Sequence, residues 1–187
     1  MSSAIVIVYH SGYGHTAKVA EAVASTSGAQ LLAIDAEGNL PDSSWQALAA
    51  AKMIVFGSPT YMGMASWQFK KFADASSKAW LAGLWNDKLA AGFTNSASMN
   101  GDKHSTLHYF MTLAMQQNML WLGMGMGMMP ANSKAASRDD INYVGSFAGL
   151  MTSSPADASA DEMVPGDIAT AKKFGQRLAA AVVKFGG

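Results

Sequence analysis

Residues 4–16 read Ala4-Ile5-Val6-Ile7-Val8-Tyr9-His10-Ser11-Gly12-Tyr13-Gly14-His15-Thr16. The first six are continuously apolar and mostly β-branched, which predicts a central strand covered on both faces. A turn with two glycines follows, and residues 17–25 have the apolar spacing of a helix. The first amides of a helix have no carbonyl partner inside it, and the helix dipole adds partial positive charge there. The stretch therefore predicts a strand, a tight turn and a helix start that together hold a phosphate group.

The turn itself supplies groups that suit an anion. Gly12 and Gly14 let the backbone approach closely, and Ser11 and Thr16 add hydroxyl donors. No Gly-Lys-Ser/Thr follows, which excludes a P-loop, and no third glycine stands where the G-x-G-x-x-G fingerprint requires one. The alternative reading is a polar strand-to-helix turn that binds no ligand.

Composition and charge limit the class of protein. The chain has 187 residues, of which 50% are hydrophobic and 14% charged, and this predicts a single globular domain spanning 1–187. The formal net charge is zero without a basic cluster, which argues against nucleic acid as a partner. The absence of cysteine excludes disulfides and thiolate metal sites and fits a cytoplasmic protein. No apolar run reaches about 18 residues, so no membrane insertion is expected.

The succession of strand and helix patterns predicts the fold class. The expected strands are 4–9, 30–34, 52–57, 88–94 and 119–122, with helical patterns between them and a last helix over about 167–184. This alternation predicts an α/β fold with an open five-stranded parallel sheet, strand order 2-1-3-4-5, and helices on both faces. A long irregular insertion is expected at about 123–166, and such segments are usually functional or interface-forming.

Three loops rich in small and polar residues follow the first, third and fourth expected strands. They cover residues 11–16, 58–64 and 95–101. Because these strands are neighbours in the expected order, the loops should converge on one rim of the sheet. Ligands of open α/β sheets bind outside the carboxyl ends of the strands, at the point where strand order reverses.

Two of these loops carry a family resemblance. Ser11-Gly12-Tyr13-Gly14-His15-Thr16 looks like an S-x-Y-G-H-[TI] phosphate loop, and Pro59-Thr60-Tyr61-Met62-Gly63-Met64 looks like a P-T-R-F-G-N/M loop. Both motifs resemble those of the flavodoxin-like superfamily, and more narrowly of the WrbA-type NAD(P)H:quinone oxidoreductases. The resemblance covers nearly the whole chain. Trp80 stands where that family carries a tryptophan that reaches the flavin across a subunit boundary.

The resemblance implies a tightly but non-covalently bound FMN. The first loop would hold its phosphate, the second would line the isoalloxazine edge, and the third would close the other side and the ribityl chain. His15 would act through its backbone amide, with its side chain packing the loop. The implied cofactor-binding residues are Ser11, Gly12, Tyr13, Gly14, His15, Thr16, Pro59, Thr60, Tyr61, Met62, Gly63, Thr94, Asn95, Ser96, Ala97, Ser98, Asn100 and Gly101.

The implied activity is two-electron, ping-pong reduction of a quinone by NAD(P)H in a homodimer or homotetramer. The alternatives are a flavodoxin-type electron carrier and an FMN-binding regulatory protein without turnover. Electron carriers of this type are strongly acidic, whereas this chain is neutral.

The chain departs from the family at two positions. Gln117 stands where relatives often have a histidine, and it cannot carry a proton at neutral pH. Tyr61 replaces a common arginine. No catalytic residue is certain, and the expected substrate-side contacts are Gln117, Trp80 and Tyr143.

Two other patterns favour structural readings. His104 and His108 are four residues apart on one helix face, but no third metal ligand accompanies them, so no metal site is expected. The glycine- and methionine-rich segment 123–130 is interpreted as filling irregular space after the last strand. A wall of the substrate pocket is its alternative role. Trp67, Trp85 and Trp121 are expected in the core or at a subunit interface.

Overall fold

The computed structural model describes residues 3–126 and 136–186. The strands are β1 (Ile5–His10), β2 (Gln30–Ile34), β3 (Met53–Tyr61), β4 (Met64–Ala65), β5 (Leu89–Ser96), β6 (Leu120–Trp121) and β7 (Leu150–Ser153). The helices are α1 (His15–Ser27), α2 (Asp42–Ala50), α3 (Trp67–Ala75), α4 (Ser77–Leu81), α5 (Lys103–Gln116), the short η1 (Ala160–Glu162) and α6 (Pro165–Phe185).

The sheet has the expected strand order. Its path runs β2-β1-β3-β5-β6, and all pairs along this path are parallel. Since β5 is the fourth strand of the expected set, the order 2-1-3-4-5 and the flavodoxin-like fold class are confirmed. The short β4 lies off the path and pairs antiparallel with the end of β3.

The fifth position of the sheet is made by two separate strands. β6 pairs with the start of β5, at Leu89 and Ala90, and β7 pairs with the end of β5, from Phe93 to Ser96. The segment 123–166, expected to be irregular, therefore contributes a strand to the sheet. β6 has two residues and accompanies only the start of β5.

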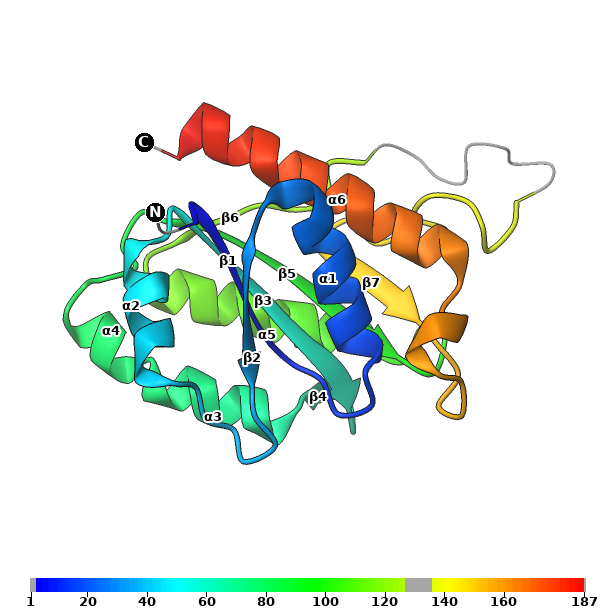
Figure 1. Cartoon of the computed structure of the whole chain (residues 1–187), viewed down its shortest axis with the longest axis horizontal. Coiled ribbons are helices and arrows are strands. Elements are labelled where there is room, and N and C mark those ends of the chain that lie inside the picture. Colours follow the sequence, from blue (N-terminus) through cyan, green and yellow to red (C-terminus); the bar gives the residue numbers. More distant parts are fainter. Residues whose placement is uncertain (1–2, 127–135, 187) are drawn as a thin grey trace.

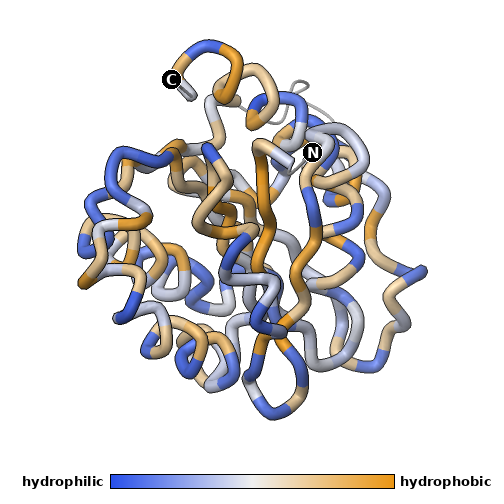
Figure 2. The backbone as a smooth tube through the Cα atoms, turned by 60° about the vertical axis from the view of Figure 1, so that its left-hand side comes forward, coloured by the Kyte–Doolittle hydropathy of each residue, from blue (hydrophilic) through white to orange (hydrophobic). Residues whose placement is uncertain are grey.

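Helices cover both faces of the sheet, as expected. Val19 of α1 and Phe174 of α6 pack on one face, and Phe69 of α3 and Phe110 of α5 pack on the other. Figure 1 shows the strands crossing the middle of the molecule between these layers, and Figure 2 shows apolar residues gathered in the central strands. No helix in the described part of the chain is long and apolar enough to cross a membrane.

Helices α1 and α6 pack tightly at Gly175. A Cβ atom there would lie 2.2 Å from Thr26 Oγ1 and 2.3 Å from the carbonyl oxygen of Val23. Gly175→Ala is expected to lower the free energy of unfolding by about 1–3 kcal/mol, because the backbone of α1 must move. Thermal and denaturant melts should show this loss, although alanine has the higher helix propensity. Gln176→Ala, at an exposed neighbouring position, is the control, and equal stability of the two variants would contradict the prediction.

Candidate functional site

The loops after β1, β3 and β5 enclose a cavity at the carboxyl edge of the sheet. Its volume is about 240 Å³. The arrowheads of β3, β5 and β7 point to this edge in Figure 1. The residues that line the cavity are Tyr13, His15, Thr16, Pro59, Thr60, Tyr61, Asn95, Ser96, Ala97, Ser154 and Ala156. The structure thus brings together members of all three loops and adds a fourth segment, which follows β7.

The first turn is held in shape by Ser11. Its Oγ accepts hydrogen bonds from the backbone N–H groups of Gly14 (3.2 Å) and Ala17 (3.1 Å). Gly14 is the N-cap of α1 and has φ 92°, a left-handed conformation that glycine adopts without strain. The first turn of α1 contains no acidic residue, so its positive end is not neutralised from within the helix.

The side chain of His15 packs the site rather than facing solvent. Its Nε2–H donates to the carbonyl oxygen of Ala158 at 2.8 Å, and the residue is buried. Nearby, Lys18 forms an exposed ion pair of 2.7 Å with Asp161. Both contacts hold the segment between β7 and α6 against the start of α1. The imidazole has the loop-packing role that the sequence suggests.

Tyr61 reaches across from the second loop to the first turn. Its ring is edge-on to that of Tyr13, with 6.2 Å between the ring centroids. A Cβ atom on Gly12 would lie 2.5 Å from the Tyr61 hydroxyl, so a larger residue at position 12 would require the Tyr61 side chain to move. Burial raises the pKa of Tyr61, and a hydrogen bond from the Gly12 backbone opposes that effect. The tyrosine that replaces the common arginine therefore closes the gap between the two loops.

Buried hydroxyl and amide groups connect the strands beneath the cavity. Thr60 Oγ1 lies 2.8 Å from Thr94 Oγ1 and 2.7 Å from Thr106 Oγ1. Asn95 Nδ2 donates to Ser154 Oγ at 2.9 Å. Ser154 is a site residue that the sequence reasoning missed. Polar serines directly after the apolar start of β7 were the signal that could have indicated it.

The third loop is tied to a buried lysine at the start of α5. Lys103 is completely buried, and its Nζ donates to Ser96 Oγ (2.9 Å) and to the carbonyl oxygens of Ser98 (2.7 Å) and Met99 (2.9 Å). Burial lowers the pKa of Lys103 to about 8, with the Asp167 carboxylate opposing this effect. The sequence does not single out Lys103, because a lone lysine near the start of a helix is usually exposed to solvent.

The stability of the unliganded protein should rise with pH because of Lys103. The unfolded state keeps the lysine proton up to the usual pKa of 10.5, whereas the folded state releases it near pH 8. Raising the pH from about 7.5 to about 9.5 is therefore expected to add of the order of 2 kcal/mol to the free energy of unfolding. Above pH about 10 the trend reverses, because burial raises the pKa of Tyr109 to about 12 and the folded state retains that proton. Denaturant melts at each pH measure both effects, and Lys103→Met should lack the first.

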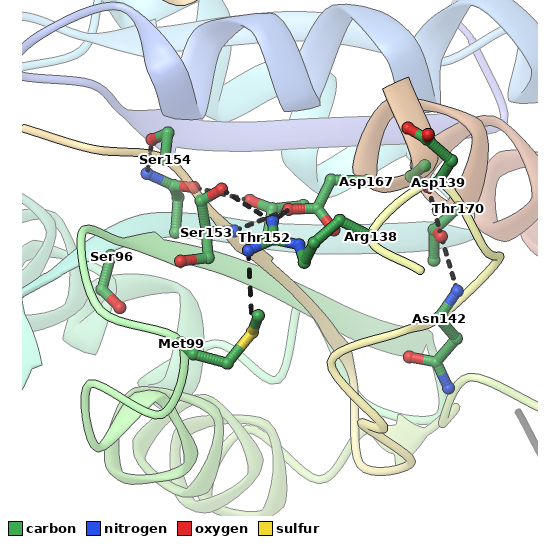
Figure 3. Close-up of polar contacts among 12 residues, drawn as sticks. Ser96, Met99, Arg138, Asp139, Asn142, Thr152, Ser153, Ser154, Asp167 and Thr170 are labelled. Atoms are coloured by element: carbon green, nitrogen blue, oxygen red, sulfur yellow. Dashed lines mark hydrogen bonds and ion pairs between the residues drawn. The ribbon is translucent and has the colours of Figure 1, made fainter. Parts of the chain in front are cut away.

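An ion pair attaches Arg138 of the insertion to the start of α6, beside the end of β7. Arg138 Nη2 lies 2.9 Å from Asp167 Oδ2, which also accepts the Ser153 backbone N–H at 2.8 Å. Figure 3 shows Arg138 between Asp167 and Met99 of the third loop, where its Nη1 lies 3.8 Å from the Met99 sulfur. Asp167 is buried, and burial raises its pKa while the bonds from Ser153 and Arg138 oppose that effect.

Within a single chain, none of the three expected substrate-side contacts lines this cavity. Gln117 is buried, and its Nε2 donates to the backbone oxygen (3.2 Å) and hydroxyl (2.9 Å) of Ser76. It lines a separate cavity of about 260 Å³ with Trp80. Tyr143 lies in a turn of the insertion, where its N–H donates to the Asp140 carbonyl oxygen. Gln117 has a structural role that its position in the sequence did not reveal.

Other predicted residues belong to the loops without lining the cavity. Some shape the first turn, Thr94 lies in the buried hydroxyl chain, and the others lie in the second and third loops. They are Ser11, Gly12, Gly14, Met62, Gly63, Thr94, Ser98, Asn100 and Gly101.

The two histidines and the described methionines of the remaining two patterns do not line the cavity. His104 and His108 are exposed with ring centroids 6.4 Å apart, and no group of three His, Cys, Asp or Glu residues within 3–126 and 136–186 could hold a metal ion. Met124 and Met126 are buried in the core between the sheet and α6, whereas residues 127–130 lie outside the described part of the chain.

A parallel sheet of this order, with its cavity at the carboxyl ends of the strands, defines a flavodoxin-like protein. The flavodoxin domain family matches residues 6–129, and the chain belongs to that family. Such a domain implies an FMN-type flavin cofactor.

Individual relatives agree with this assignment. A protein named Flavodoxin FldP from Pseudomonas aeruginosa is 49% identical over 177 residues, which are 95% of each chain. The crystal structure of a flavodoxin, WrbA-like protein from Agrobacterium tumefaciens is 48% identical, with a TM-score of 0.80 over 97% of this chain and 98% of that one. A protein named NAD(P)H dehydrogenase (quinone) from Geotalea uraniireducens is 28% identical over 97% of this chain and 98% of its own. The resemblance to WrbA-type flavodoxin-like proteins is confirmed.

Proposed function

We propose that this protein is an FMN-dependent NAD(P)H:quinone oxidoreductase that reduces quinones by two electrons in a ping-pong sequence. The observation that carries the proposal is the cavity at the carboxyl edge of the sheet. Three loops wall it with hydroxyl and amide groups, and none of the described residues that line it is acidic. Such a surface suits a ligand with a phosphate at one end and a ring that gains negative charge on reduction.

The residues present fit FMN. The amides at the start of α1 and the hydroxyls of Ser11 and Thr16 would hold its phosphate, while Tyr61 and the third loop would flank the ring. Bound FMN would supply the hydride and electron chemistry, and the protein would supply orientation and charge. The relatives named NAD(P)H dehydrogenase (quinone) support NAD(P)H as the donor and a quinone as the acceptor.

The second candidate is a flavodoxin-type one-electron carrier. The name of the Pseudomonas aeruginosa relative favours it, as does the absence of a titratable group at Gln117. The zero net charge opposes it, because docking of such a carrier to a basic partner depends on a strong acidic field.

An anaerobic titration separates the two. FMN-reconstituted protein is mixed with NADPH, and separately with NADH, while the visible absorbance of the flavin is recorded. The oxidoreductase predicts direct two-electron bleaching by at least one of them and recovery of the absorbance on adding benzoquinone. Bound FMN that neither nicotinamide bleaches, but that a chemical reductant reduces in two separate one-electron steps, would establish the carrier instead.

We also propose that the protein forms a homodimer or homotetramer. Met62, Met64 and Trp67 are exposed beside Tyr61 and line one groove next to the second loop. Exposed apolar side chains gathered in this way mark interaction surfaces. Sedimentation equilibrium with and without FMN would test the proposal, and a monomer at micromolar concentration in both states would exclude it.

A further inference from the structure

The third loop is turned so that its carbonyl oxygens face the protein. The Ser96 oxygen accepts the Ser154 N–H at 3.2 Å, and the Ala97 oxygen accepts Ser153 Oγ at 3.3 Å. Lys103 donates hydrogen bonds to the next three carbonyl oxygens in the chain. Its Nζ donates to those of residues 98 and 99, and its backbone N–H donates to that of residue 100 at 3.2 Å.

The opposite edge of the same loop consists of free donors. Within residues 3–126 and 136–186, no protein acceptor takes the N–H groups of residues 97–101. Gly101 has φ 52°, and Asp102 continues in the left-handed region at 49°, which lets the loop reverse into α5. Successive N–H groups with their carbonyls turned away form an anion-binding surface.

Among the residues that the structure describes, no carboxylate is hydrogen-bonded to the ammonium behind this surface. All its donors are used on Ser96, Ser98 and Met99, so its charge stays uncompensated by hydrogen bonding to an acid. The charged groups that act on it from neighbouring elements are Asp167 of α6 and Arg138 of the insertion. Because those two are paired with each other at 2.9 Å, the cluster keeps one net positive charge.

We propose that Lys103 is a positioning residue of the flavin site, which holds the third loop in place where Ser96 and Ala97 line the cavity and favours the reduced, anionic ring over the oxidised ring. The proposal rests on FMN binding at this cavity. It assigns Lys103 an action through the loop and through its field, without contact with the ligand. In a low-dielectric surrounding, such a charge acts strongly on a neighbouring anion.

The test compares flavin potentials, measured by spectroelectrochemistry at pH about 7, in wild type, Lys103→Met and Lys88→Met. Lys88 is the matched control, because its Nζ also donates to two backbone carbonyls, those of Ala49 and Ala51, at the other end of β5. Lys103→Met is expected to weaken binding of reduced relative to oxidised FMN at least tenfold, which lowers the two-electron potential by about 30 mV. Lys88→Met should leave the potential unchanged.

The dependence on pH gives a second measurement. The potential gap between wild type and Lys103→Met should close as the pH rises through about 8, because wild type then loses the ammonium proton. Lys103→Arg keeps its charge throughout, so it should match the wild-type potential at pH about 7 and should lack the step near pH 8. This arm also serves if Lys103→Met does not fold.

The outcomes distinguish failure of this inference from failure of the proposed function. FMN bound by all variants with equal potentials, or Lys103→Arg following wild type through the same pH step, would overturn the role of Lys103. Wild type that shows no quenching of FMN fluorescence on mixing would instead remove the proposed function on which the inference rests.

Discussion

Thr16→Asp is expected to weaken FMN binding at least roughly a hundredfold while leaving the fold intact. Thr16 is buried, lines the cavity and lies in the first turn of α1, beside amides without helical partners. A carboxylate there would take the place of the phosphate and repel it. At the same time it would interact favourably with the helix dipole, which contributes about 0.3–1 kcal/mol at such positions. Titration by quenching of FMN fluorescence measures the affinity, and thermal melts of the unliganded variant measure the stability.

Two variants control this experiment. Ser43→Asp places the same charge in the first turn of α2, away from the cavity, and should change neither FMN affinity nor the potential. Thr16→Ser keeps a hydroxyl and should bind FMN within a few-fold of wild type. Retention of wild-type affinity by Thr16→Asp would show that the phosphate does not bind at the start of α1.

Among the substitutions proposed here, Asp167→Ala should produce the largest fall in the free energy of unfolding. The carboxylate is buried and accepts from both Arg138 and the Ser153 backbone, so its removal leaves a partly buried guanidinium without its carboxylate and a buried N–H without its acceptor. Breaking one side of a buried pair costs about 3–5 kcal/mol. For a chain of this size that corresponds to a fall in melting temperature of about 6–20 °C, measured by calorimetry.

The matched control is Asp161→Ala. Asp161 also forms an ion pair at 2.7 Å, but its side chain is 86% exposed, and surface pairs of this kind contribute little to stability. Equal melting temperatures for the two variants would contradict the account of Asp167. A second readout is FMN affinity, which should fall in Asp167→Ala, because Ser153 and Ser154 carry the end of β7 into the site.

The fold and the meeting of the loops followed from local patterns. An apolar run such as 4–9 tolerates no solvent-facing side, and glycines at 12 and 14 allow a tight turn into α1. Parallel strands joined by helices then place the loops at one edge. These properties belong to neighbouring residues, so they are visible in the sequence without knowledge of distant contacts.

What escaped prediction depends on side-chain contacts that the pattern of residue types does not show. Ser154 enters the site because Asn95 binds it across β5 and β7, and the burial of Lys103 depends on the folding of residues 96–99 around it. Gln117 was expected near substrate by analogy with a histidine, whereas within the chain its amide binds Ser76 in a different cavity.

The division of the fifth sheet position between β6 and β7 has a consequence for the way the sheet opens. β6 and β7 pair with different halves of β5, so the two ends of this edge are separate units for local unfolding. The end next to the cavity can exchange its amide hydrogens while the other end remains closed. A ligand that rests against Ser154 should therefore slow deuterium uptake at residues 150–153 and leave residues 120–121 unchanged.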